Sequence, residues 1–192
     1  DVRRENLTWA HSEAHEVVGE ECSAVRDAAG IIDLSGSAKY EVTGKDAFAF
    51  LDHLSCNRLP GTDGRIGLSL FHLPNGGIMS EVSITRLADD HFYLVSAIGS
   101  EHKDLYWMEL NADEFEVEIK NVTEEISSML LTGPRAREIL QQMTEEDLSN
   151  GAFPWLHARE VKIDSAAVRV IRVSYAGELG YELHMPSYQL LS

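Results

Sequence analysis

Short runs of β-branched and aromatic residues, divided by glycine, proline and asparagine turns, recur along most of this chain. The clearest turn is Pro74-Asn75-Gly76-Gly77, which separates the apolar runs 68–72 and 78–87 and is typical of a β-hairpin. Expected strands outnumber expected helices, and several strands are joined by tight turns. This pattern predicts an α+β fold with antiparallel sheets rather than a doubly wound parallel sheet.

The expected elements alternate along the chain without an internal repeat or an obvious linker. Helical patterns occupy residues 17–29, 44–59, 100–110 and 134–143. Strand patterns occupy residues 31–34, 38–43, 68–72, 78–87, 92–97, 115–119, 126–131, 161–163, 166–175 and 180–185.

The first two helices and the second strand carry apolar residues at the spacing expected of a buried face. In the first helix these residues are Cys22, Val25, Ala28 and Ala29, with Gly30 expected as the C-cap. The second helix aligns Phe48, Leu51 and Leu54, and the strand 38–43 points Tyr40 and Val42 inward. These residues are the predicted core of the N-terminal half.

Composition limits the classes of partner. The 192 residues are 44% hydrophobic, which is enough to bury a core in one large or two small domains. The formal net charge of −16 argues against a nucleic-acid partner, because phosphate contacts require clustered lysines and arginines. No apolar run reaches the roughly 18 residues that a membrane span needs, so we expect no membrane partner.

Cysteines and histidines offer little sign of metal or redox chemistry. Cys22 and Cys56 lack a C-x-x-C spacing, and each stands in an apolar helical pattern, so buried or semi-buried reduced thiols are predicted. His11 and His15 are four residues apart and could hold a metal on a helix, but solvated histidines are favoured. We therefore predict no metal site.

Residues 172–182 read R-V-S-Y-A-G-E-L-G-Y-E and form the densest cluster of polar chemistry in the chain. Glycines at 177 and 180 permit a turn between two strands, or a close approach of the backbone to a ligand. Glu178 and Glu182 lie four residues apart across this turn. From the pattern alone, an ordinary hairpin with solvated acids is favoured over a binding site.

A resemblance shifts that balance toward a binding site. The chain resembles the folate-binding transferases typified by the glycine cleavage T-protein, an aminomethyltransferase, and within them the C-terminal halves of dimethylglycine and sarcosine dehydrogenases. Seven ordered segments, spread over about 165 residues, carry the resemblance. They are G-E-E-C-S-A-V-R-D-A-A-G-I-I-D-L-S from Gly19, G-K-D-A-F-A-F-L-D from Gly44, G-R-I-G from Gly64, N-G-G-I from Asn75, T-G-P-R-A-R-E-I-L from Thr132, D-L-S-N-G-A-F-P from Asp147, and the hairpin from Arg172.

The resemblance implies a fold and a domain context. The family fold consists of two interleaved ferredoxin-like units with antiparallel sheets, followed by a small barrel, with folate between them. In this chain the C-terminal barrel is expected to be absent, so residues 17–192 are a truncated folate-binding domain after an N-terminal segment, 1–16. An upstream flavin domain is implied outside this chain. The cut interface predicts a homodimer or an exposed apolar face.

The same resemblance implies tetrahydrofolate as cofactor and assigns four site residues. Glu182 matches the carboxylate that accepts hydrogen bonds from the pterin edge, and Tyr175 matches a tyrosine that lines the same pocket. Glu81 stands where relatives carry the aspartate nearest the reacting amine, so it is the expected catalytic residue. Leu68 stands where relatives carry a tyrosine of the cofactor pocket.

Two functions follow from these matches. The first is tetrahydrofolate-dependent transfer of a one-carbon group, aminomethyl or methylene, derived from a small-molecule amine. The second is a non-catalytic folate-binding module with a regulatory or assembly role. The replacements at Glu81 and Leu68 leave folate binding expected but weaken the expectation of fast transfer, so the second function gains on the first. Arg135 and Arg137, in a first helical turn, are expected to form salt bridges or to contact the folate tail. The expected location is the cytoplasm, or the mitochondrial matrix in a eukaryote.

Overall fold

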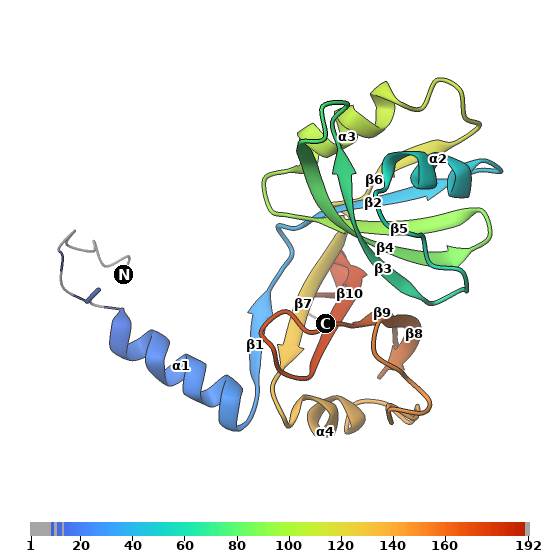
Figure 1. The fold of residues 1–192 in the computed structure, drawn as a ribbon. Coiled ribbons are helices and arrows are strands. Elements are labelled where there is room, and N and C mark those ends of the chain that lie inside the picture. The colour runs from blue at the N-terminus through green and yellow to red at the C-terminus, as the bar shows by residue number, and fades with distance from the viewer. Residues whose placement is uncertain (1–8, 10, 13, 191–192) are drawn as a thin grey trace.

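The computed structural model describes residues 9, 11–12 and 14–190, which form two five-stranded sheets and four α-helices within these ranges (Figure 1). Most of the predicted N-terminal segment, 1–16, therefore lies outside the described residues. The first sheet has the order β1 (Gly30–Asp33), β7 (Ile126–Thr132), β10 (Gly180–Pro186), β9 (Ala166–Arg172) and β8 (His157–Ile163). The second sheet has the order β3 (Ile66–His72), β4 (Ile78–Ala88), β5 (His91–Ser96), β2 (Ala38–Thr43) and β6 (Glu118–Asn121).

The two sheets are interleaved along the chain, as predicted. β1 belongs to the first sheet, β2 to β6 build the second, and β7 to β10 return to the first (Figure 1). Every ladder in both sheets is antiparallel. Within the described residues both sheets are open, and no closed barrel is formed. The prediction of an α+β fold with antiparallel sheets is confirmed.

One face of the second sheet packs against two helices, α2 (Ala47–Leu54) and α3 (Glu101–Leu110). Tyr40 and Val42 are fully buried there, as their alternation predicted. The predicted helical stripe was partly wrong, because Phe50 is fully buried whereas Phe48 is exposed. The ring of Phe50 packs edge-on against Phe115, with centroids 5.5 Å apart, which fixes the rotation of α2 on the sheet.

The outer face of the first sheet packs on α4 (Ala136–Gln141). Tyr181 and Leu183 of β10 point into this cluster with Leu131 of β7 and Leu140 of α4. Since side chains alternate across a strand, the residues between them on β10 point toward the second sheet.

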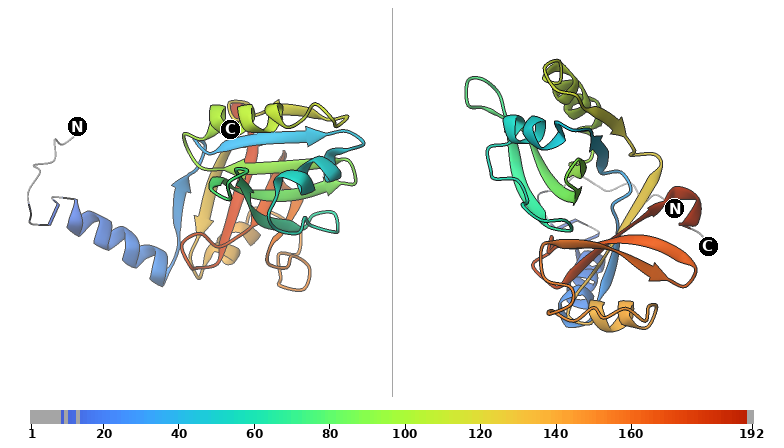
Figure 2. Two further views of the ribbon diagram at one scale, coloured as in Figure 1. Left: turned by 45° about the horizontal axis from the view of Figure 1, so that its top comes forward. Right: turned by 90° about the vertical axis from the view of Figure 1, so that its right-hand side faces the viewer.

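The two sheets meet through a third cluster of side chains. Its fully or nearly fully buried members are Ile66, Tyr93, Val122, Ala158 and Ile171, drawn from both sheets and from the turn before β7. An antiparallel bridge between Arg65 and His157 joins the edges of the two sheets. Figure 2 shows the two sheets lying against each other. The inter-sheet face is thus a packed interface bordered by polar groups.

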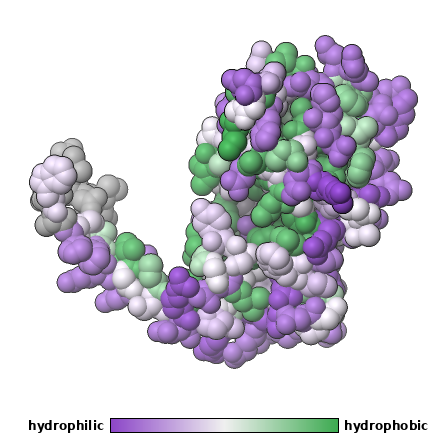
Figure 3. All heavy atoms as spheres, viewed as in Figure 1, coloured by the Kyte–Doolittle hydropathy of each residue, from purple (hydrophilic) through white to green (hydrophobic). Residues whose placement is uncertain are grey.

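The first helix, α1 (His15–Asp27), does not pack as predicted. It is helical, but none of its residues is fully buried, because it extends away from the two sheets (Figure 1). Most of its apolar side chains are exposed, Val17 and Val18 among them, while Val25 is partly buried. Apolar side chains are visible along the helix in Figure 3. Gly30 begins β1 instead of capping the helix. Cys22 on α1 and Cys56 after α2 are unpaired and both exposed, so the prediction of buried thiols was wrong.

Several strand boundaries differ from the predicted ones; β8, for example, begins at His157 and not at residue 161. Two of the differences concern aromatic residues. The strand expected at 115–119 begins at Glu118, because Phe115 packs its ring into the helical core before the ladder starts. β9 ends at Arg172, so Tyr175 lies in the connection to β10 and not in a strand. No helix among the described residues is long and apolar enough to cross a membrane.

We predict that Gly133 is essential for the junction between β7 and α4. Its φ is +123°, and a Cβ built there would lie 2.6 Å from the carbonyl oxygen of Ala28 and 2.7 Å from Cα of Ala29. Gly133→Ala is expected to lower the free energy of unfolding by about 2 to 4 kcal/mol, measured by denaturant titration. Gly76→Ala is the matched control, because Gly76 also has a positive φ, +82°, but faces open space. It should cost about 1 kcal/mol, and equal losses for the two variants would contradict the clash.

Candidate functional site

Glu182 occupies the middle of β10, on the side that faces the second sheet. It pairs with Leu130 of β7 and Ile171 of β9, so its backbone is held by ladders on both sides. Its side chain is 16% exposed, which leaves the carboxylate shielded but reachable. Such a half-buried carboxylate retains access for a ligand while losing most of its water, which strengthens its hydrogen bonds.

A buried histidine contacts this carboxylate. His184 is two residues further along β10, on the same face, and its Nε2 lies 3.0 Å from Oε2 of Glu182. Its Nδ1 lies 2.9 Å from the hydroxyl oxygen of Tyr93, which belongs to β5 of the second sheet. The hydrogen-bonded series Tyr93, His184 and Glu182 therefore crosses the interface between the sheets.

Cationic side chains surround this series. Lys39 of β2 is fully buried, and its Nζ donates to the carbonyl oxygens of Ser35 at 2.9 Å and Ser37 at 2.8 Å. Burial lowers the pKa of Lys39, and the nearby charge of Glu182 opposes that shift. The guanidinium of Arg169 lies over the ring of Tyr93, 4.6 Å from its centroid, and 3.6 Å from the carboxylate of Glu41. The buried ammonium of Lys39 is thus satisfied by backbone carbonyl oxygens, whereas Arg169 pairs with a carboxylate.

Glu81 and Leu68 lie on the same face of the second sheet as Tyr93. The register pairs Thr85 with Tyr93, and Glu81 lies four residues before Thr85 on β4, so the two share a face. Leu68 pairs with Ser83, which lies between them on that face. Glu81 is exposed, and Leu68 is 53% exposed. Strand alternation therefore directs Glu81, Leu68 and Glu182 toward the inter-sheet side, while their roles stay predictions.

Tyr175 lies apart from these strands. It stands in the loop between β9 and β10 and is 83% exposed. Gly177 supplies the turn of this loop with a φ of +82°. Glu178 forms a 2.6 Å ion pair with Arg26 of α1, so it is not simply a solvated acid. The predicted turn is confirmed, and the place of Tyr175 in a ligand pocket stays a prediction.

The two arginines of α4 have different partners. Arg135 forms the expected salt bridge, with Glu138, at 2.9 Å. Arg137 forms no salt bridge within the described part of the chain, and instead donates to the hydroxyl of Tyr181 at 3.0 Å and to the side-chain oxygen of Asn150 at 2.6 Å. Both are thereby engaged within the protein, and contact with a folate tail stays untested.

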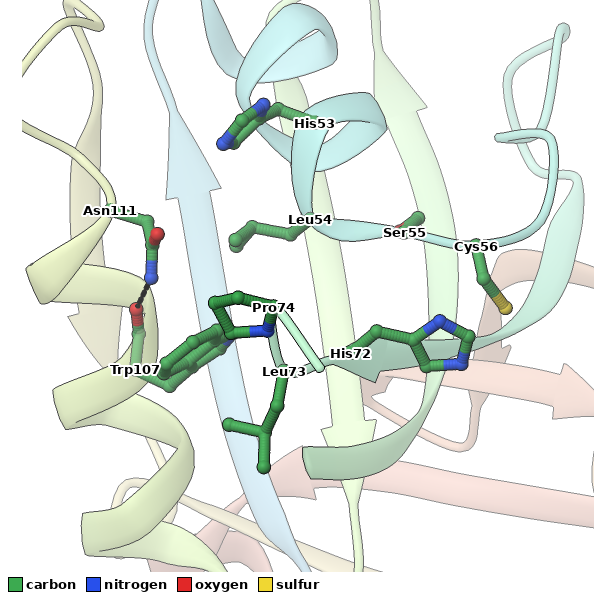
Figure 4. A pocket seen from close by; sticks show the side chains of 9 residues that line it. All are labelled: His53, Leu54, Ser55, Cys56, His72, Leu73, Pro74, Trp107 and Asn111. Carbon is green, nitrogen blue, oxygen red and sulfur yellow. Dashed lines mark hydrogen bonds between the residues drawn. The ribbon is translucent and has the colours of Figure 1, made fainter. Parts of the chain in front are cut away.

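Most of the histidines and cysteines lie away from Glu182. His11 and His15 stack with ring centroids 4.1 Å apart, and the described residues include no group of three potential metal ligands. A groove of about 280 Å³ lies between α2, α3 and the β3–β4 turn (Figure 4). His53, Cys56, His72 and Trp107 are among its lining residues, and none of the four predicted site residues is.

Three residues around Glu182 were missed by sequence reasoning. His184 was recognisable in principle, because a residue two positions from Glu182 on a strand must share its face. Lys39 was obscured by the apolar pattern of its strand, and Tyr93 was taken only as part of a strand. The contact between Tyr93 and His184 joins positions 91 residues apart, so no local sequence pattern predicts it.

Comparisons with known proteins define the class of this chain. The GCVT N-terminal domain family matches residues 4–192. The fold of two interleaved antiparallel sheets agrees with this match. The chain belongs to the GCVT N-terminal domain family.

Individual relatives come from two kinds of protein. Human mitochondrial dimethylglycine dehydrogenase is 37% identical over 171 residues, which cover 88% of this chain and 20% of that protein. Aminomethyltransferase of Thermoanaerobacter sp. (strain X514) is 38% identical over 180 residues, which cover 93% of this chain and 49% of that protein. The chain therefore spans between a fifth and a half of the length of these relatives.

Solved structures agree with the fold. Aminomethyltransferase T of the glycine cleavage system from Bartonella henselae superposes with a TM-score of 0.76 at 26% identity, covering 87% of this chain and 44% of that one. Heterotetrameric sarcosine oxidase from Corynebacterium sp. U-96 superposes with a TM-score of 0.66 at 16% identity, covering 94% of this chain and 89% of that one. The second likeness concerns the fold alone.

We predict that His184 makes stability depend on pH. Burial lowers the pKa of His184, so the unfolded chain binds its proton at a higher pH than the folded chain does. The contribution of the neutral His184 to the free energy of unfolding is fully present above about pH 6.5. It is lost as the pH falls, by at most about 1.4 kcal/mol per pH unit. In denaturant titrations between about pH 7 and about pH 5, the free energy of unfolding should fall less in His184→Gln than in the wild type.

The control for this prediction is His102→Gln, at an exposed position on α3. That variant should keep the wild-type pH dependence. An unchanged slope in His184→Gln would contradict the prediction, because it would mean that His184 binds its proton equally in the folded and the unfolded chain.

Proposed function

We propose that this chain is the tetrahydrofolate-binding domain of a one-carbon transferase that handles a methylene or aminomethyl group derived from a small amine. The observation that carries this proposal is Glu182, a shielded but reachable carboxylate held on a central strand of a GCVT N-terminal domain. The relatives named aminomethyltransferase and dimethylglycine dehydrogenase support the same class of reaction.

The chemistry of Glu182 suits a reduced pterin. A pterin edge presents a ring N–H beside an exocyclic amine, and an ionised carboxylate accepts from both. Oε2 accepts from His184, and Oε1 has no hydrogen-bond partner among the described residues. Since each carboxylate oxygen has two lone pairs, Glu182 retains the capacity for a bidentate pair.

Glu81 carries the proposed transfer step. Tetrahydrofolate, when bound, supplies the amine that accepts the methylene group. Glu81 orients that amine and stabilises the positive charge that accompanies the transfer. Compared with an aspartate, its additional methylene moves the carboxylate by about 1 to 1.5 Å, and an uncorrected shift of this size can cost about a hundredfold in rate. The smaller Leu68 gives this longer side chain room.

Tyr175 completes the proposed pocket from its loop. A tyrosine ring offers a flat apolar surface for a pterin and a hydroxyl for a hydrogen bond. Its exposure in this chain means that ligand contact, rather than core packing, would account for an aromatic residue here.

The wider context follows from the family resemblance. The amine-derived substrate, a flavin domain upstream of this chain, and a homodimer are parts of the proposal that concern the intact protein. We place the protein in the cytoplasm, or in the mitochondrial matrix as for the mitochondrial relative.

A non-catalytic folate-binding module is the alternative function. Two departures that the resemblance implies favour it: Glu81 stands in place of an aspartate at the proposed reacting position, and Leu68 lacks the hydroxyl of a tyrosine. Both changes affect transfer, whereas Glu182 serves binding. The two functions are therefore separable by experiment, because the module binds folate without turnover.

Glu182→Gln tests binding. The change replaces one acceptor oxygen with an amide donor, so it should weaken tetrahydrofolate binding by roughly 1.5 to 3 kcal/mol in titration calorimetry of the intact protein. Glu118→Gln, at an exposed position on β6, is the control and should bind like the wild type. Equal affinity of the Glu182→Gln variant would reject the role of this residue.

Glu81 variants test transfer. In the intact protein, Glu81→Asp should keep or raise turnover, while Glu81→Ala should abolish most of it, because no carboxylate then reaches the amine within about 2.6 to 3.2 Å. The assay measures formation of methylene-tetrahydrofolate from the amine donor, with Glu118→Ala as the control. Unchanged turnover in Glu81→Ala would refute its catalytic role, and folate binding with no turnover in the wild type would favour the module.

A further inference from the structure

We propose that His184, itself oriented by Tyr93, is a positioning residue that holds the Glu182 carboxylate in place for its ligand. This inference rests on the proposed function, because it concerns the same carboxylate. It adds two residues, from two different sheets, that act through Glu182 and do not themselves react.

The hydrogen-bond partners determine the direction of each bond. An ionised carboxylate only accepts, so Nε2 of His184 must carry the proton that it donates to Oε2 of Glu182. A neutral imidazole with a protonated Nε2 has a lone pair on Nδ1. Tyr93 therefore donates its hydroxyl proton to Nδ1. Donation runs in one direction along the series, from Tyr93 through His184 to Glu182.

The surroundings favour the neutral ring that this direction requires. Four titratable or charged side chains face His184: Glu182 on its own strand, Arg169 on β9, Tyr93 on β5 and Lys39 on β2. Burial lowers the pKa of His184 most, Lys39 and Arg169 lower it further, and Glu182 opposes them. The ring is therefore neutral at physiological pH and is fixed as a single tautomer.

Tyr93 is itself tightly held. It is fully buried in the inter-sheet cluster, its ring makes an edge contact with the ring of His184 at 5.5 Å, and the Arg169 guanidinium lies over it. A long-range contact between sheets thus sets the rotamer of His184. Through His184, the packing of the sheets sets the plane of the Glu182 carboxylate, and bidentate recognition depends on that plane.

A double-mutant cycle tests this positioning. Affinity for 5-formyltetrahydrofolate is measured by calorimetry in the intact protein for the wild type, Tyr93→Phe, Glu182→Gln and the double variant. Tyr93→Phe should weaken binding by about threefold to tenfold, and this effect should disappear in the Glu182→Gln background. His184→Gln, whose amide can donate from near the Nε2 position, should retain more affinity than His184→Leu.

Tyr40→Phe is the matched control. Tyr40 is equally buried and also makes one hydroxyl hydrogen bond, to the carbonyl oxygen of Glu101 at 2.8 Å, but on the opposite face of the same sheet. Its loss should lower stability without changing affinity. A similar loss of affinity in Tyr40→Phe, or an effect of Tyr93→Phe that persists beside Glu182→Gln, would overturn the inference.

A second readout needs no ligand. Nitrogen NMR of the imidazole should report a neutral ring protonated at Nε2, with an Nδ1 that accepts a hydrogen bond. Tyr93→Phe should remove the hydrogen bond to Nδ1, while Nε2 keeps the proton that it donates to Glu182. A wild-type ring protonated at Nδ1 would overturn the inference, even if the His184 variants fail to fold. Failure of the wild type to bind any folate would reject the proposed function, whereas binding that Tyr93→Phe leaves unchanged would reject only the positioning role.

Discussion

The contact between Tyr93 and His184 is the constraint on which the arrangement of this domain depends. It joins β5 of the second sheet to β10 of the first, inside the cluster where the sheets pack. Apolar packing alone is non-directional and tolerates small sliding movements. A buried hydrogen bond with defined donor and acceptor does not, because sliding would leave both groups unsatisfied at a cost of about 1 to 3 kcal/mol. This contact therefore helps to set the relation between the two sheets, together with the bridge between Arg65 and His157 at their edges.

Buried polar groups serve the helical side of the second sheet in a similar way. Asp104 of α3 is fully buried, and its Oδ2 accepts from the hydroxyls of Ser80 at 2.9 Å and Ser96 at 2.6 Å. These serines belong to β4 and β5, so the carboxylate fixes the helix to two neighbouring strands. The second sheet is thus held by directional bonds on both faces, by Asp104 on one and by Tyr93 on the other. A sheet fixed in this way is a rigid support for a binding site.

Local patterns predicted the elements well and their packing less well. The bounds of β2 agree with the predicted strand, and the turn at Asn75 and Gly76 connects β3 to β4, because alternation and turn chemistry act within a few residues. The burial of α1 was predicted wrongly, since a helical apolar stripe shows which face can pack but not whether another surface meets it.

The residues of the candidate site differ in the same way, between those that the sequence indicates and those that only the packing brings together. Glu182 was singled out by the family resemblance and not by its local pattern, which favoured an ordinary hairpin. Tyr93 and Lys39 reach its surroundings from distant strands, and only the register of the sheets brings them there. Residues that act through long-range pairing carry no local signature, because their neighbours in sequence belong to other clusters.

The protein holds the two carboxylates of the proposed site with different firmness. Glu182 lies on a central strand with ladders on both sides, and its carboxylate is held by His184. Glu81 lies on a strand face that is open to solvent, and its carboxylate has no hydrogen-bond or ion-pair partner among the described residues. A side chain without partners keeps its rotamer freedom and must lose it to act at a defined distance. In the proposed function, recognition of the ligand would thus depend on a preorganised group and transfer on a group that the ligand itself must order, so substitutions at the second position would alter rate without altering affinity.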